Sequence, residues 1–418
     1  MDNTFFKTEK RIYEFTLNKI ARYLIYICVF YLFFLKYAFG ERRIILYGTA
    51  SLATLCMIVD LFIMRVNILE LFPLGVLINP IMCVYSLITG ILVATNQSSL
   101  ISAVKTYAAF SLVCLVICYI SVEEKKLDWM TNAIIIIDII SAVYVMTKGT
   151  YYRGYGYVIG ADQNPNNLGL AMDLGLFCAA LRARKDRKNI LGSLAVAILF
   201  IYIIIGCGSR KSLFAAIIIC ALWMIPAVMD HWEKSGVCGK LVLILSILAA
   251  IGFVFYYYHH YYINTYSYTR MQTLGDNDEG SSGHRILFYK YALDYFLERP
   301  LLGIGLDQFS VWNPFHQYAH STYAEALADW GIVGCMIYFI PSIWAGFKLI
   351  SKMFSDKENR YATCIFLAIW SVEIFLGLGQ IWFYEIEHLI TWTIIFVFLF
   401  LYRNVDISKM RAYKYVKG

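Results

Sequence analysis

The chain has 418 residues, of which 60% are hydrophobic and only 16% are charged. A soluble chain carries about 25% charged residues, so this composition excludes an ordinary soluble protein. Apolar stretches long enough to cross a hydrocarbon core of ~30 Å recur from end to end. A spanning segment must satisfy its own backbone hydrogen bonds, and helices do this within one segment. We therefore predict an all-α polytopic membrane protein.

Residues 1–418 are expected to form one integral membrane domain. The N-terminal segment is long and charged before its first apolar run, with no small-residue cleavage site, so the first helix is expected to be retained. About twelve spans are predicted, with centres near residues 29, 54, 84, 110, 138, 174, 198, 220, 248, 334, 369 and 393.

The basic residues indicate the orientation, because cytoplasmic segments of membrane proteins are enriched in Lys and Arg. With the N-terminus inside, most of the 36 Lys and Arg fall in inside segments or the C-terminal tail. Both termini are then cytoplasmic. The net charge of +7 is explained by this bias, so no nucleic-acid partner is expected.

Two outer loops are long in this topology, about 148–165 and 258–319. The second, between spans nine and ten, is the one large extracytoplasmic loop and is part of the same domain. The chain has no two-fold internal repeat and no matching pair of Gly/Pro-broken helices, which counts against the common transporter architectures. A transporter or flippase of an anionic lipid-linked glycan is the least favoured alternative.

The sequence "CGSRKS" at 207–212 follows the seventh predicted span. Ser209 can cap the next helix, which leaves free N–H groups beside Arg210 and Lys211. A helix N-terminus binds anions and an arginine donates a bidentate fork, so this turn suits a phosphate. The alternative is that both cations extend toward lipid headgroups.

In the large loop, "SSGHRILFYKYALDYFLERPLLGIG" at 281–305 predicts a helix that begins at Ser282 or Gly283 and ends at Pro300. Its apolar residues at spacings of three and four favour a helix along the membrane surface; they are Ile286, Tyr289, Leu293 and Phe296. Arg285 falls in the first turn, where the helix dipole disfavours a cation. An anionic partner would explain it, and a solvated arginine is the alternative.

The sequence "HQYAHSTYAEALADWG" at 316–331 places His316 and His320 four residues apart, on one face if the helix begins early. A histidine at the outer end of a span can act as a general base near neutral pH. Glu325 could orient it or pair with an arginine. Two histidines do not make a metal site, so no metal is expected. Interfacial hydrogen bonding is the alternative for this segment.

Taken together, these elements resemble the O-antigen ligase and polymerase superfamily of polytopic membrane glycosyltransferases. The matching segments are "NPNNLG" at 164–169, "GSRKS" at 208–212, "HRILFYKYALDYFLERPLLGIGLDQF" at 284–309 and "HSTYAEALADWGIVG" at 320–334. Their order, the number of spans and the single large outer loop agree with the family.

The resemblance implies a fold similar to C-type glycosyltransferases, with a site on the outer face of the bacterial inner membrane. Such enzymes take a glycan from undecaprenyl pyrophosphate and use no nucleotide sugar, cofactor or metal. The match assigns pyrophosphate binding to Arg210 and Arg285 and acceptor activation to His320. Lys211 is an auxiliary candidate. Arg153 and Arg299 are weaker candidates, and His316 is a neighbour.

Arg210, Arg285 and His320 are therefore expected to converge on one outward cavity. A polymerase of O-antigen, capsule or exopolysaccharide is favoured over a ligase that transfers the glycan to lipid A core, because the motifs are near their common form. The expected partners are the lipid-linked oligosaccharide and the bilayer, with a chain-length regulator protein as a further candidate.

Overall fold

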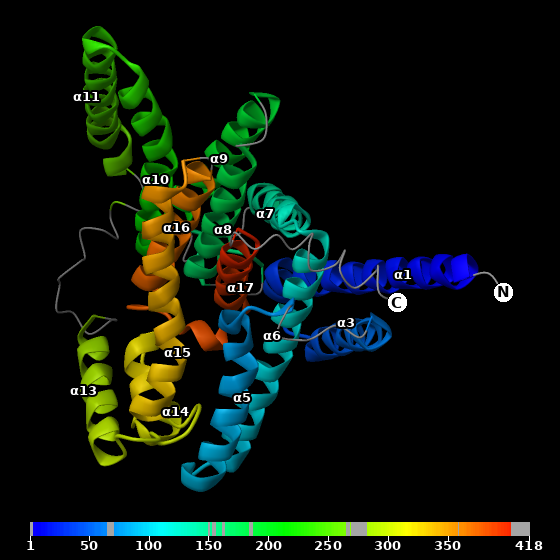
Figure 1. Ribbon diagram of the computed structural model, residues 1–418. Helices are drawn as coiled ribbons and strands as arrows, with labels where there is room; N and C mark the ends of the chain where they lie inside the picture. Colours follow the sequence, from blue (N-terminus) through cyan, green and yellow to red (C-terminus); the bar gives the residue numbers. More distant parts are fainter. Residues whose placement is uncertain are drawn as a thin grey trace.

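The computed structural model describes residues 3–64, 71–148, 151–152, 156–160, 164–183, 187–264, 268, 282–357 and 359–402, and this part of the chain is almost entirely helical (Figure 1). The long helices are α1 (Asn3–Phe30), α3 (Arg43–Met64), α5 (Leu74–Val93), α6 (Gln97–Glu124), α7 (Asp128–Lys148), α8 (Pro165–Ala183), α9 (Arg187–Cys207), α10 (Arg210–Lys234), α11 (Val237–His260), α13 (Ser282–Glu298), α15 (Thr322–Ser355), α16 (Arg360–Leu376) and α17 (Ile386–Leu401). The short elements are η1 (Tyr31–Leu35), α2 (Lys36–Phe39), η2 (Tyr262–Asn264), α14 (Phe309–Trp312), η3 (Trp382–Tyr384) and the antiparallel pair β1 (Tyr151–Tyr152) and β2 (Gly156–Tyr157).

Each of the twelve predicted span centres falls within one of these helices. Within the described residues, eight helices are long and apolar enough to cross a membrane. Shorter apolar helices occur at Val237–Ala249 and Ile386–Leu401. The all-α polytopic class is therefore confirmed, whereas the number of twelve spans stays a prediction.

The connections between helices gather at two ends of the bundle. At one, which we call the loop end, Gln308 Oε1 accepts hydrogen bonds from the backbone N–H groups of Thr95 (3.1 Å) and Asn96 (2.8 Å). At the opposite end, Glu233 pairs with Lys357 and with Arg360, both at 3.2 Å. Connections that the alternating topology puts on one side thus contact each other in the structure.

The large-loop helix α13 begins at Ser282 and ends at Glu298, as the sequence predicts. It lies beside α15, with α14 close by (Figure 1). The predicted apolar stripe faces outward, because Ile286 and Leu293 are exposed. A second apolar face, with Phe288 and Tyr295, is buried against α14 and the chain before α15. The sequence pattern did not separate these two faces.

Helix α15 is broken at Gly331, whose φ of 61° and ψ of −169° are non-helical. The break leaves carbonyl groups without helical partners. The turn after α13 supplies these partners, since Ile304 N–H donates to Ala328 O and Gly305 N–H donates to Asp329 O, both at 2.9 Å. This pairing satisfies buried backbone groups and fixes the large loop onto the start of α15.

The buried carboxylate of Asp329 has a structural role at the same break. It accepts hydrogen bonds from the backbone N–H groups of Asp307 (2.7 Å) and Phe309 (3.0 Å). The chain entering α14 is thereby held against α15.

We predict that Gly303→Ala destabilises the protein. Gly303 has a φ of +70°, and an added Cβ would overlap the backbone of Ala328 and Asp329. The left-handed backbone alone costs an alanine about 1–2 kcal/mol. Thermal unfolding of the purified protein should show a lower midpoint. Gly192→Ala is the matched control, because its Cβ would meet nothing within 4 Å; an equal loss in both variants would contradict the assignment.

Candidate functional site

The start of α10 is built as the sequence predicts. Ser209 is its N-cap, and its side chain accepts a hydrogen bond from the Ser212 N–H. The Ser209 hydroxyl in turn donates to Asn166 Oδ1 at 3.0 Å. Asn166 belongs to the first turn of α8, which opens at Pro165. The "GSRKS" and "NPNNLG" segments therefore meet at the loop end, with Arg210 and Lys211 in the first turn of α10.

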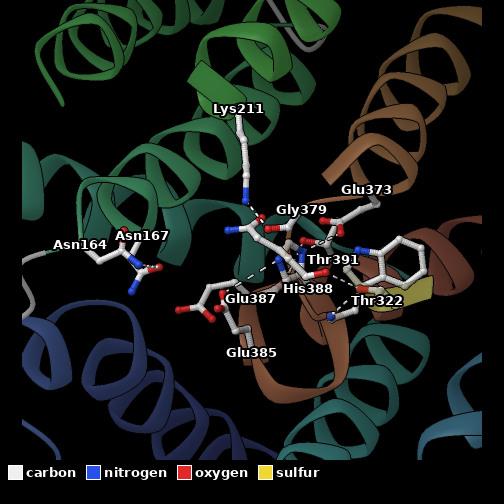
Figure 2. Close-up of polar contacts among 12 residues, drawn as sticks. Asn164, Asn167, Lys211, Thr322, Glu373, Gly379, Glu385, Glu387, His388 and Thr391 are labelled. Atoms are coloured by element: carbon white, nitrogen blue, oxygen red, sulfur yellow. Dashed lines mark hydrogen bonds and ion pairs between the residues drawn. The ribbon is translucent and has the colours of Figure 1, made fainter. Parts of the chain in front are cut away.

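Lys211 reaches from α10 to the connection between α16 and α17. Its Nζ donates a hydrogen bond to the Gly379 carbonyl, and Figure 2 shows the side chain extending from its helix toward Gly379 and the group at 385–388. Lys211 also interacts electrostatically with Arg285, Glu385 and Arg210. It is thus held among the charged groups of several elements.

The carbonyl groups of the 377–380 loop join α10 to two further elements. Leu378 O accepts a hydrogen bond from the Tyr289 hydroxyl of α13 at 2.8 Å. Gly377 O and Gln380 O both accept from the N–H of Thr322, the first residue of α15, at 2.8 Å. The sequence interpretation missed this loop. Its signal is the "GLGQ" sequence between two apolar helices.

His320 lies just before α15, not on it. The helix begins at Thr322 with Ser321 as its N-cap, and both His316 and His320 have left-handed backbones, with φ of 51° and 55°. The expectation that they share a helical face is therefore wrong, because the cap at Ser321 delays the helix. His316 is exposed, and its Nδ1 lies 3.3 Å from Ser310 O. The structure separates the two histidines.

Two aromatic rings pack near the His320 ring. The ring centroid lies 4.2 Å from that of Tyr318 and 5.9 Å from that of Phe288 on α13. The preceding residue, Ala319, donates its N–H to the buried Glu325 carboxylate. Glu325 therefore holds the backbone immediately before His320, and the orienting role expected for it stays a prediction.

Burial and two nearby cations determine the charge state of His320. Burial contributes most, and Arg285 and Lys211 add to it, so that together they lower the pKa of His320 to about 4. The imidazole is therefore neutral at pH 7. Arg285 has a buried Nε without a hydrogen-bond partner among the described residues. Two cations beside a neutral ring form a site suited to an anion.

The predicted site residues do not all belong to this group. Arg299 donates to Val93 O at 3.0 Å, at the C-terminus of α5, and stacks on Trp312 with its guanidinium 5.7 Å from the ring centroid. It lies fourteen residues after Arg285 on or just beyond one helix, so about 21 Å separates them along the axis. Arg299 thus has a structural partner far from His320. Arg153 lies outside the described residues.

Residues 194–339 match the family model of the O-antigen ligase. This match supports the O-antigen ligase and polymerase superfamily. The matched range includes both α10 cations, Arg285 and both histidines. The residues of the candidate site named above from α10, α13 and the start of α15 therefore lie within the range that matches the family. Members are membrane enzymes of the glycosyltransferase type. No curated protein matches the chain.

We predict that Glu325→Ala lowers the turnover of the enzyme by about tenfold or more, whereas Glu325→Gln retains most of it. The alanine removes the acceptor for the Ala319 N–H and leaves that buried donor unsatisfied, which costs about 1–3 kcal/mol. A glutamine keeps an acceptor oxygen. Glycan transfer by the two purified variants, each with its unfolding midpoint, tests this. Equal activity in both would argue against a positioning role.

Proposed function

We propose that the protein is a polymerase of a bacterial surface polysaccharide. It transfers a glycan from undecaprenyl pyrophosphate to an acceptor hydroxyl on a lipid-linked repeat unit, at the outer face of the inner membrane, with both termini cytoplasmic. The observation that supports this most is the placement of Arg285 and Lys211 beside a neutral His320 within the family segment.

In the proposed reaction the acceptor oxygen forms a bond to the anomeric carbon of the donor sugar. The bond from that carbon to the phosphate oxygen breaks, and the lipid pyrophosphate leaves with the electron pair. Negative charge therefore grows on the phosphate in the transition state. The guanidinium groups of Arg210 and Arg285 would stabilise this charge more in the transition state than in the ground state, and so accelerate the transfer.

His320 takes the proton of the acceptor hydroxyl in this scheme. Before the donor binds, the cations beside the ring weaken it as a base, because they lower its pKa. A bound pyrophosphate would offset the effect of the cations and raise the pKa of His320, while the larger effect of burial would stay. Donor binding would thus make His320 a stronger base for the acceptor hydroxyl. Because His320 is a weaker base before this, hydrolysis of the donor would be limited.

A ligase is the alternative, since the same groups serve either acceptor and the matching family model is described as O-antigen ligase. The test is an assay of the purified protein with lipid-linked repeat units alone and with lipid A core added. Chains of increasing length in the first reaction are expected. Transfer only to lipid A core would assign the ligase function, and no new glycosidic bond in either would refute both.

Arg210→Lys is predicted to reduce turnover by at least tenfold although it conserves the charge. An arginine donates two parallel hydrogen bonds to a phosphate, and a lysine cannot reproduce this planar fork. Steady-state polymer synthesis measures the effect. Lys234→Arg, at the far end of the same helix, is the control and should be neutral. Full polymer synthesis by Arg210→Lys would argue against bidentate phosphate binding.

The pH profile should report the lowered pKa of His320. The base must be neutral, so kcat/KM is lost as pH falls through its folded pKa, at about 4, and not near the ordinary value of about 6.5. Lys211→Gln removes one cation and should move this acid limb to higher pH. An acid limb near 6.5 in the unaltered enzyme, or no movement in the variant, would contradict the assignment.

A further inference from the structure

The opposite end of the bundle has a cavity that the proposed reaction does not use. Its volume is about 480 Å³, and it lies between the α6–α7 connection and the ends of α8, α16 and α17. Lys125, Lys126 and Arg182 contribute its cations, and Phe366 and Phe398 are among its apolar residues. Three cations and two aromatic rings thus line one cavity between membrane helices.

The positions of its lining residues place this cavity away from His320. Lys125 is the C-cap of α6. The other end of α6 has Asn96 as its N-cap, and the Asn96 N–H donates to Gln308 Oε1 at the loop end. Arg182 lies in the last turn of α8, whose first turn meets Ser209. The length of α6, 28 residues, corresponds to about 42 Å. The cavity therefore faces the other leaflet.

The summed charge of the lining residues and the adjoining helix ends is positive. One carboxylate, that of Asp128, also lines the cavity. The C-termini of α6, α8 and α17 contribute about half a negative charge each, and the N-termini of α7 and α16 about half a positive charge each. Three cations exceed this sum, so an anion is favoured in the cavity.

An apolar cavity adjoins the basic one, and a further apolar cavity adjoins that one. Arg182 and Asn132 line a second cavity of about 390 Å³ between α7, α8 and α9, with Ile136, Ala179 and Gly192 among its other residues. A third, of about 360 Å³, shares Asn132 and Ile136 and continues along α7. The Arg182 guanidinium donates to Asn132 Oδ1 at the junction. Arg182 thus lines both the basic cavity and the neighbouring apolar one.

We propose that these cavities bind one anionic phospholipid of the leaflet opposite the transfer site. The phosphate lies by Lys125, Lys126 and Arg182, and an acyl chain lies along Ile136, Ala179 and Gly192. Basic pockets between membrane helices bind anionic lipid headgroups in this way. A free phosphate offers the same headgroup chemistry but has no use for the apolar cavities. The lipid would join α6, α7, α8 and α16, and so stabilise the bundle.

The part of the proposal that concerns the lipid headgroup is tested on the purified full chain in a neutral detergent. Phosphatidylglycerol, phosphatidylethanolamine and inorganic phosphate are added separately, with native mass spectrometry and the unfolding midpoint as readouts. Phosphatidylglycerol should bind and raise the midpoint. The double variant Lys125→Gln/Lys126→Gln should lose affinity about thirtyfold, on about fivefold for each cation near a membrane surface. Lys234→Gln/Lys240→Gln is the control outside the cavity and should bind normally.

The part of the proposal that concerns the acyl chain is tested with Gly192→Phe. An added side chain at Gly192 meets open space, so the variant should fold while its ring fills the apolar cavity and weakens lipid binding at least fivefold. Gly252→Phe is the matched control, because Gly252 also has nothing within 4 Å. Equal binding of phosphatidylethanolamine, an equal effect of inorganic phosphate, or unchanged affinity in either test variant would overturn the proposal. Loss of glycan transfer is not a readout here, so the two proposals fail separately.

Discussion

The backbone carbonyl groups of the 377–380 loop are the constraint on which the candidate site depends. They accept hydrogen bonds from Lys211 of α10, Tyr289 of α13 and Thr322 of α15. These three helices are separated by long stretches of sequence. A loop without a charged side chain of its own thus determines how far the cations lie from the histidine.

The cations of the candidate site are subject to two opposing physical requirements. Under the proposed function, cations must lie close together to bind a doubly charged leaving group, yet each cation makes its neighbours less favourable. The anion is expected to offset this repulsion, so the empty site is electrostatically unfavourable and the occupied site is not. The buried Nε of Arg285, unpartnered among the described residues, is consistent with a site completed by its ligand. Stability sacrificed in this way is common at functional sites.

Much of the architecture was predictable, because membrane spans depend on local composition. The cap at Ser209, the bounds of α13 and the positions of twelve helices followed from periodicity and turn chemistry. The left-handed backbone of His320 was not predictable, since the residues around it are held by contacts such as that of Ala319 N–H with Glu325 on α15, which no local pattern encodes. The role of Arg299 was also missed. Its partner, the Val93 carbonyl, is about 200 residues away in sequence, and no local pattern encodes such a contact.

The break at Gly331 has a consequence for how the enzyme meets its membrane. Residues 332–355 alone form a helix of about 36 Å, which already exceeds a hydrocarbon core of ~30 Å. The part of α15 before the break, with His320 ahead of it, can therefore stand in the headgroup layer, where a lipid pyrophosphate also resides. The depth of the site is then set by hydrophobic matching of the later part. Under the proposed function, the acyl-chain length of the host membrane would thus set how deep His320 lies relative to the lipid-linked donor.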